Sequence, residues 1–190
     1  MTLLTNISLP AENERLTAGL FLVSGLAAQI ALLLAFSAAE TPVQAITSIL
    51  LLFIALAAGY LAAQWAVFSR RSRRAKIYTG FLINAGGLLL LLLAAQGALH
   101  GLSLLPGVMV CGLGQGSVIR AIKGENELFR PHFSPFVTGL GVLVALIAVG
   151  ICLAIAAHFA GTSGYPYAFA SLLDLSLLAA LHAKITQREG

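Results

Sequence analysis

Long apolar runs alternate with short polar segments along the whole chain. A helical run of about 20 apolar residues crosses a hydrocarbon core of about 30 Å, because each residue adds about 1.5 Å. The pattern therefore predicts an all-α integral membrane protein with six transmembrane helices. The predicted spans are residues 16–38, 45–68, 77–99, 102–119, 136–159 and 166–183.

Polar residues mark the limits of the predicted units. We expect a polar N-terminal segment at 1–15, a six-helix membrane domain at 16–184 and a polar tail at 185–190. Pro42 precedes the second run, and proline is favoured in the first turn of a helix, so it can open that helix. The N-terminal segment lacks the basic and then apolar order of a secretory signal peptide, so we expect none.

Composition supports a membrane protein rather than a soluble one. The chain is 59% hydrophobic and 9% charged, whereas about a quarter of the residues in a typical soluble domain are charged. The net charge of +4 does not indicate nucleic-acid binding, because the basic residues flank the apolar runs. Anionic lipid headgroups attract basic residues in such positions, so the expected partner is the lipid bilayer.

The basic residues are distributed unevenly between the loops. With six helices, all eleven Lys and Arg residues fall on one side of the membrane. Basic loops stay on the cytoplasmic side. We therefore expect a multi-pass protein of the plasma (inner) membrane with both termini in the cytoplasm. The densest group is a basic loop between the second and third helices, made of Arg70, Arg71, Arg73, Arg74 and Lys76.

Several motifs occur in a characteristic order. The fourth predicted helix carries a Pro106-Gly107 pair and then three alternate glycines, and Gly59 and Tyr60 precede the basic loop. With Tyr167 near the start of the last run, these segments resemble the C-terminal half of major facilitator superfamily transporters. The closest branch is the drug:proton antiporters of the multidrug-efflux type. The resemblance covers roughly residues 16–184.

The resemblance implies membrane transport by one six-helix lobe of a two-lobed, proton-coupled exporter of small molecules. A second lobe would come from another chain or from a second copy in a parallel homodimer. The basic loop would then act as a cytoplasmic latch against that lobe, besides anchoring topology. The alternative is a non-transporting membrane protein, either a truncated transporter remnant or an assembly partner.

Single polar residues inside the apolar runs are the candidate site residues. An amide at membrane depth must find a partner or line a wet cavity, so Gln29, Gln64 and Gln115 are candidates for a substrate cavity. Convergence of these amides on one face would favour transport, and bonding within the bundle would favour a structural role. For Asn84 and Gln96, which are also single amides in apolar runs, we expect interhelical bonds. Asp174 is the only acidic residue well inside a span, which makes it the candidate for proton coupling; pairing with a histidine or snorkelling is the alternative.

The three alternate glycines of the fourth predicted helix are Gly112, Gly114 and Gly116. Small residues allow helix backbones to approach closely in a bilayer. They serve either tight packing alone or, as the resemblance implies, flexing during alternating access. The sequence shows no nucleophile–base pair, phosphate-binding loop or metal-ligand spacing. We therefore expect no enzyme activity, no cofactor and no metal.

Overall fold

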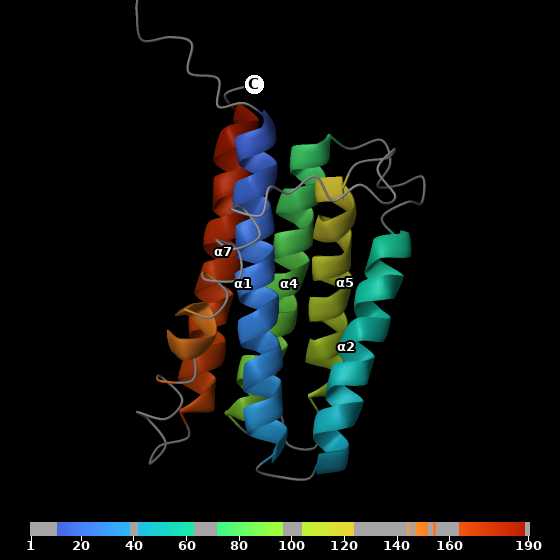
Figure 1. Ribbon diagram of the computed structural model, residues 1–190, viewed down its shortest axis with the longest axis vertical. Helices are drawn as coiled ribbons and strands as arrows, with labels where there is room; N and C mark the ends of the chain where they lie inside the picture. Colours follow the sequence, from blue (N-terminus) through green and yellow to red (C-terminus); the bar gives the residue numbers. More distant parts are fainter. Residues whose placement is uncertain are drawn as a thin grey trace, which may run out of the picture.

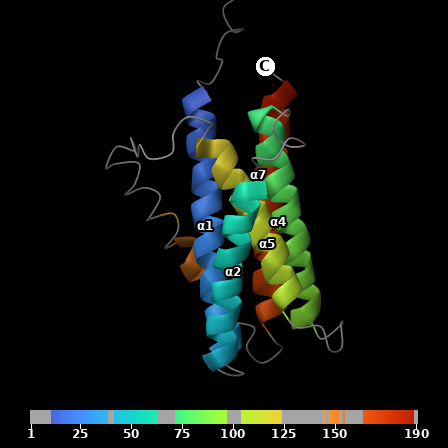
Figure 2. The same cartoon turned by 90° about the vertical axis from the view of Figure 1, so that its right-hand side faces the viewer.

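The computed structural model describes residues 11–38, 42–62, 72–96, 104–123, 144, 147–151, 154 and 164–188. These residues form a bundle of helices that run side by side (Figures 1 and 2). Residues 144, 147–151 and 154 are also helical. The described part of the chain contains no strand, so the predicted all-helical fold is confirmed. The main helices are α1 (Ala11–Ala38), α2 (Pro42–Ala62), α4 (Arg73–Ala95), α5 (Leu105–Lys123) and α7 (Tyr165–Arg188).

Four of these helices are long and apolar enough to cross a membrane. The stretches that qualify are Leu16–Leu33, Arg73–Ala95, Leu105–Ile122 and Tyr165–Ile185. They match the predicted spans 16–38, 77–99, 102–119 and 166–183. Helix α2 contributes a shorter apolar stretch, Ile46–Ala62, where the span 45–68 was predicted. Most of the predicted span 136–159 lies outside the described residues, so the total of six spans stays a prediction.

The basic cluster is partly helical, which corrects the prediction that it forms a loop. Helix α4 begins at Arg73, so Arg73, Arg74 and Lys76 lie in its first turn. Ser72 caps this turn, because its Oγ accepts a hydrogen bond from the backbone N of Ala75 at 3.3 Å. Hydropathy marks where an apolar run ends and not where a helix ends. The expected loop residues Arg70 and Arg71 lie outside the described part.

Three other helices also extend past their apolar runs, and one begins where predicted. Helix α1 starts within the expected polar segment 1–15, α5 continues to Lys123, and α7 continues to Arg188 through most of the expected tail. Lys, Arg and Glu are good helix formers, so a helix can continue into charged sequence beyond the bilayer. Helix α2 begins at Pro42, as the sequence predicted.

The helix directions follow from which residues meet. Helix α5 runs parallel to α2, because Gly112 lies against Leu52 and Gly116 lies against Leu56. It runs antiparallel to α4, because Gly80 lies against Val118 whereas Gly87, later in α4, lies against Cys111, earlier in α5. Helices α1 and α7 are also antiparallel. Tyr165 Oη donates to the backbone oxygen of Ala35 at 3.2 Å, near the start of α7 and the end of α1.

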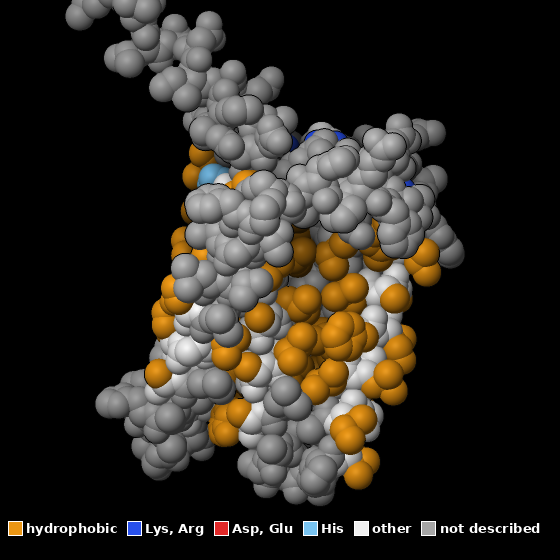
Figure 3. Space-filling view, in the orientation of Figure 1, with side chains coloured by type: hydrophobic (Ala, Val, Ile, Leu, Met, Phe, Trp, Pro, Cys, Tyr) orange, Lys and Arg blue, Asp and Glu red, His pale blue; other side chains and the backbone are white. Residues whose placement is uncertain are grey.

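All described basic residues gather at one end of the bundle. This end holds the start of α1 and α4 and the end of α2, α5 and α7, at the top of Figure 1. Figure 3 shows Lys and Arg atoms at the same end and an apolar surface over the middle. Arg120 lies over the Tyr60 ring at 5.4 Å and donates to its hydroxyl at 3.2 Å. The residues are Arg15, Arg73, Arg74, Lys76, Arg120, Lys123, Lys184 and Arg188.

The buried apolar residues form two clusters, one toward each end of the bundle. Helix α4 places Phe81 in the cluster near the basic end and Leu88 in the other. Helices α5 and α7 also contribute to both clusters. A polar residue lies between the two contributions on each of these helices: Asn84, Gln115 and Ser176. The apolar core is therefore interrupted by a polar layer near the middle of the bundle.

Candidate functional site

Four buried polar side chains, each from a different helix, meet in this layer. Gln29 comes from α1, Asn84 from α4, Gln115 from α5 and Ser176 from α7, and the most exposed of them, Asn84, is only 6% exposed. We call these residues the polar cluster. Each of the four lies on the buried face of its helix, so packing of the helices against one another removes all four from the surface.

The two glutamines of the polar cluster bond to each other. Gln115 Nε2 donates to Gln29 Oε1 at 2.6 Å. This bond joins α5 to α1 across the interior of the bundle. Buried polar groups are costly in lipid unless they are paired, so the bond favours the docking of α1 against α5.

The second pair of the cluster joins α4 to α7. Asn84 Nδ2 donates to Ser176 Oγ at 3.1 Å, and Ser176 Oγ donates to the backbone oxygen of Phe81 at 2.9 Å. The serine hydroxyl therefore acts both as acceptor and as donor. This is the interhelical bond that the sequence predicted for Asn84. The Cys111 thiol of α5 also reaches α4, at 3.6 Å from the backbone oxygen of Asn84.

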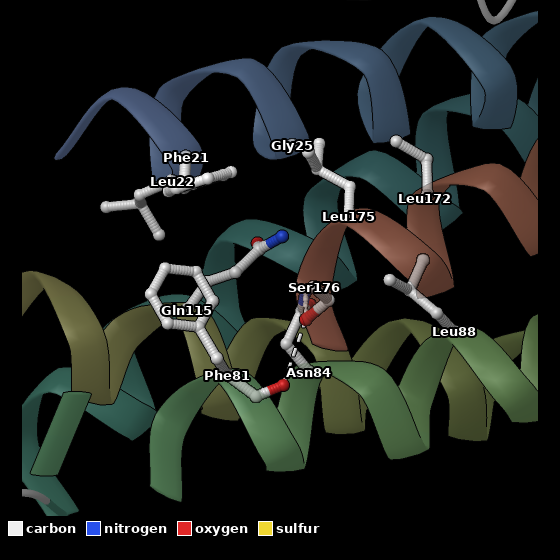
Figure 4. Close-up of a pocket in the computed structure, with 10 residues that line it drawn as sticks. All are labelled: Phe21, Leu22, Gly25, Phe81, Asn84, Leu88, Gln115, Leu172, Leu175 and Ser176. Atoms are coloured by element: carbon white, nitrogen blue, oxygen red, sulfur yellow. Dashed lines mark hydrogen bonds between the residues drawn. The ribbon is translucent and has the colours of Figure 1, made fainter. Parts of the chain in front are cut away.

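A small pocket lies between α1, α4, α5 and α7 (Figure 4). It has room for about one water molecule. Three members of the polar cluster line it, and the rest of the lining is apolar apart from one glycine. The lining residues are Phe21, Leu22, Gly25, Phe81, Asn84, Leu88, Gln115, Leu172, Leu175 and Ser176.

Three atoms of the polar cluster have no hydrogen-bond partner in the described part of the chain. They are Gln29 Nε2, Asn84 Oδ1 and Gln115 Oε1, although the weakly accepting thiol of Cys111 lies near the Gln29 amide. Leaving a buried polar group unpaired costs about 1–3 kcal/mol, so native proteins rarely keep such groups without a reason. A bound molecule or a functional role is the usual reason, and two of the three atoms belong to residues that line the pocket.

Glycines hold α5 tightly against α2 and α4. A Cβ at Gly112 would lie 2.6 Å from Ala55 Cβ on α2, and a Cβ at Gly114 would lie 2.5 Å from Asn84 N on α4. Gly116 faces the backbone of Leu56 on α2. The three alternate glycines thus serve two faces of α5, because Gly112 and Gly116 meet α2 whereas Gly114 meets α4.

Helix α1 is not held by such glycine contacts. A Cβ added at Gly19 or Gly25 would meet nothing within 4 Å. Gly25 also lines the pocket, so α1 covers the pocket without close backbone packing at this point. The glutamine pair is therefore a main polar link between α1 and the tightly packed helices.

The structure brings only some of the site residues predicted from the sequence together. Gln29 and Gln115 come together, but inside the bundle rather than on an outer face. Asp174 is exposed on α7 and does not line the pocket, so its role in proton coupling stays a prediction. Gln64 lies outside the described residues. Gln96 is exposed at the C-terminal end of α4 rather than buried between helices. Sequence reasoning missed Ser176, because a serine in an apolar helix commonly bonds to its own backbone and gives no distinct signal.

Other chemistry in the described residues is limited. No group of three or more His, Cys, Asp or Glu side chains among them is placed to hold a metal ion. Comparison with protein-family models, curated proteins and solved structures finds no match to the chain. Functional inference therefore rests on the polar cluster, the pocket and the sequence motifs.

Proposed function

We propose that this chain is a membrane transport protein whose solute passes through the polar cluster. The observation that supports this function is the set of unpaired amide atoms buried midway along the bundle. A bundle with a purely structural role would be more stable with these atoms paired or replaced by apolar groups. Transporters place their substrate sites near the bilayer midplane, where polar groups are otherwise avoided.

The small size of the pocket requires movement during transport. Room for about one water does not admit a larger solute. We expect α1 to move, because a Cβ added at Gly19 or Gly25 would meet nothing within 4 Å, whereas the glycines of α5 are closely packed. Separation of α1 from α5 would break the bond between Gln29 and Gln115 and expose both amides to the solute.

The finer assignment to a drug:proton exporter rests on the sequence motifs. In a two-lobed exporter the solute site lies between the lobes, and the polar cluster lies inside this one bundle. Our proposed solute path lies within this chain and so differs from that arrangement. A second lobe or a parallel homodimer is the assembly that the motifs imply. Proton coupling through Asp174 belongs to the same assignment.

We further propose that the basic end of the bundle faces the cytoplasm of a plasma (inner) membrane. Lys and Arg near the ends of spans are retained on the cytoplasmic side. The start of α1 and the end of α7 both lie at this end, so both termini would be cytoplasmic.

A second candidate function is that of a non-transporting assembly partner or transporter remnant. The bond between Gln115 and Gln29 inside the bundle is the outcome expected for a structural role. The close glycine packing of α5 and the small pocket also favour this candidate, because a rigid and closed bundle suits such a role. In that case the glutamine pair serves only to hold α1 in place.

Transport by the chain alone is the test. The chain would be expressed in cells that lack their own efflux pumps, and accumulation of a fluorescent cationic dye would be followed with and without a protonophore. Export predicts lower accumulation that the protonophore reverses. Gln115→Ala should abolish this effect, and Gln96→Ala should retain it, because Gln96 is exposed at the C-terminal end of α4.

The amount of each variant in the membrane must be measured in the same cells. Accumulation equal to that in empty-vector cells, with the wild-type chain present in the membrane, would overturn export of this dye class. Loss of membrane protein in Gln115→Ala, with unchanged transport per molecule, would show that Gln115 stabilises the bundle and does not lie on the solute path.

A further inference from the structure

We propose that the pocket between α1, α4, α5 and α7 binds one ordered water molecule that bridges Gln115 and Asn84. Both residues line this pocket (Figure 4). This water site goes beyond the proposed function and can be tested without a transport assay, because it concerns the bundle with its pocket closed.

The two amide oxygens supply the polar partners. Gln115 Oε1 and Asn84 Oδ1 have no hydrogen-bond partner in the described residues, and their side chains are 2% and 6% exposed. A water molecule carries two hydrogens that it can donate, one to each oxygen. It also accepts hydrogen bonds, so it serves either orientation of the Gln115 amide.

The pocket fits water better than another ligand. Its volume suits about one water molecule, and a buried water needs at least two polar partners. The apolar lining residues, such as Phe21 and Leu172, offer no competing polar group. A metal cation would lack a carboxylate, because no Asp or Glu lines the pocket.

The bridging water would unite the two hydrogen-bonded pairs. Gln29 bonds to Gln115, and Asn84 bonds to Ser176, which bonds to the backbone of Phe81. With the water between Gln115 and Asn84, these bonds form one continuous network through α1, α5, α4 and α7. The polar cluster then acts as one unit rather than as two separate pairs.

Nuclear magnetic resonance of the full chain in lipid nanodiscs tests this site. Magnetisation transfer from water to the side-chain amide protons of Asn84 and Gln115 would be measured in nitrogen-15-labelled protein. We expect cross-peaks to both side chains, with the sign of a long-lived contact. The exposed Gln96 amide is the control for fast exchange with bulk water. Absence of water cross-peaks at both buried amides in the wild-type chain would overturn the water site.

Two variants separate a bridging water from other contacts. Asn84→Leu removes one acceptor and should abolish the water cross-peak of Gln115. Ser171→Ala changes a side chain that does not line the pocket and should retain this cross-peak. A Gln115 cross-peak that persists in folded Asn84→Leu protein would overturn the bridge. If Asn84→Leu does not fold, Gln115→Leu serves as the reciprocal variant, in which the Asn84 cross-peak should disappear.

Discussion

Gln115 and Gln29 lie 86 positions apart in the chain, and a hydrogen bond of 2.6 Å joins their buried amides. Replacing one partner leaves the other buried and unpaired, which costs about 1–3 kcal/mol. We expect Gln115→Leu to lower the free energy of unfolding by about this amount. The double variant Gln29→Leu/Gln115→Leu should cost less than the sum of the two single variants. The free energies of unfolding of the single and double variants can be measured by unfolding the chain with sodium dodecyl sulfate in mixed micelles while its helix content is monitored. Strict additivity would show that the two amides are not coupled.

Gly86 and Gly87 are neighbours on α4 with opposite surroundings. A Cβ at Gly87 would lie 2.5 Å from Cys111 N, whereas a Cβ at Gly86 would meet nothing within 4 Å. We expect Gly87→Ala to destabilise the bundle by about 1–3 kcal/mol through overpacking. Gly86→Ala should be neutral or slightly stabilising, because alanine favours the helix. The same unfolding experiment compares the two variants, and equal effects would contradict the close packing of α4 and α5.

Ser176 and Ser171 lie on the same helix and offer a second matched pair. The hydroxyl of Ser176 bonds across to α4, whereas that of Ser171 bonds to the backbone of Tyr167 on its own helix at 3.0 Å. Ser176→Ala leaves the Asn84 amide without its acceptor, so we expect a loss of about 1–3 kcal/mol. Ser171→Ala should change stability by less than about 0.5 kcal/mol. A larger effect for Ser171→Ala than for Ser176→Ala would argue against the α4–α7 bond.

The two ends of α4 allow a direct test of orientation. Ser72 and Gln96 are both exposed and lie at opposite ends of this helix. In a chain with Cys111 and Cys152 replaced by alanine, Gln96→Cys should react with a membrane-impermeant maleimide in intact cells. Ser72→Cys should react only after permeabilisation, because the basic end is expected in the cytoplasm. The reverse labelling pattern would place the basic end outside.

The helices themselves were predictable from the sequence, because long apolar runs have few other structures available in lipid. Their ends were less so. Arg73 and Lys123 belong to helices although hydropathy places them in loops, since helical backbone continues into charged sequence without penalty. Pro42 marked the start of α2 in advance. Ser72, the N-cap of α4, was a second local signal that did not enter the prediction.

The polar cluster was only partly predictable. Gln29 and Gln115 stand out as amides in apolar runs, but their pairing depends on how α1 and α5 rotate about their axes, which a single sequence does not fix. Ser176 could not be selected in advance, because its bond to Asn84 joins positions 92 residues apart. The pocket depends on side-chain volumes from four helices and has no sequence signature.

The glycine contacts on both faces of α5 have a consequence for biosynthesis. Helix α5 is the least hydrophobic of the four candidate spans, with a mean hydropathy of 1.3 against 1.5 to 2.0 for the others, because it contains Gln115 and Arg120 as well as these glycines. A weakly hydrophobic helix inserts into the bilayer poorly when alone. Close backbone packing against a neighbouring helix can supply the missing stabilisation. Helix α4 leaves the ribosome before α5 and runs antiparallel to it. We therefore expect these two helices to enter the membrane together as a hairpin, in which contact with α4 favours the insertion of α5.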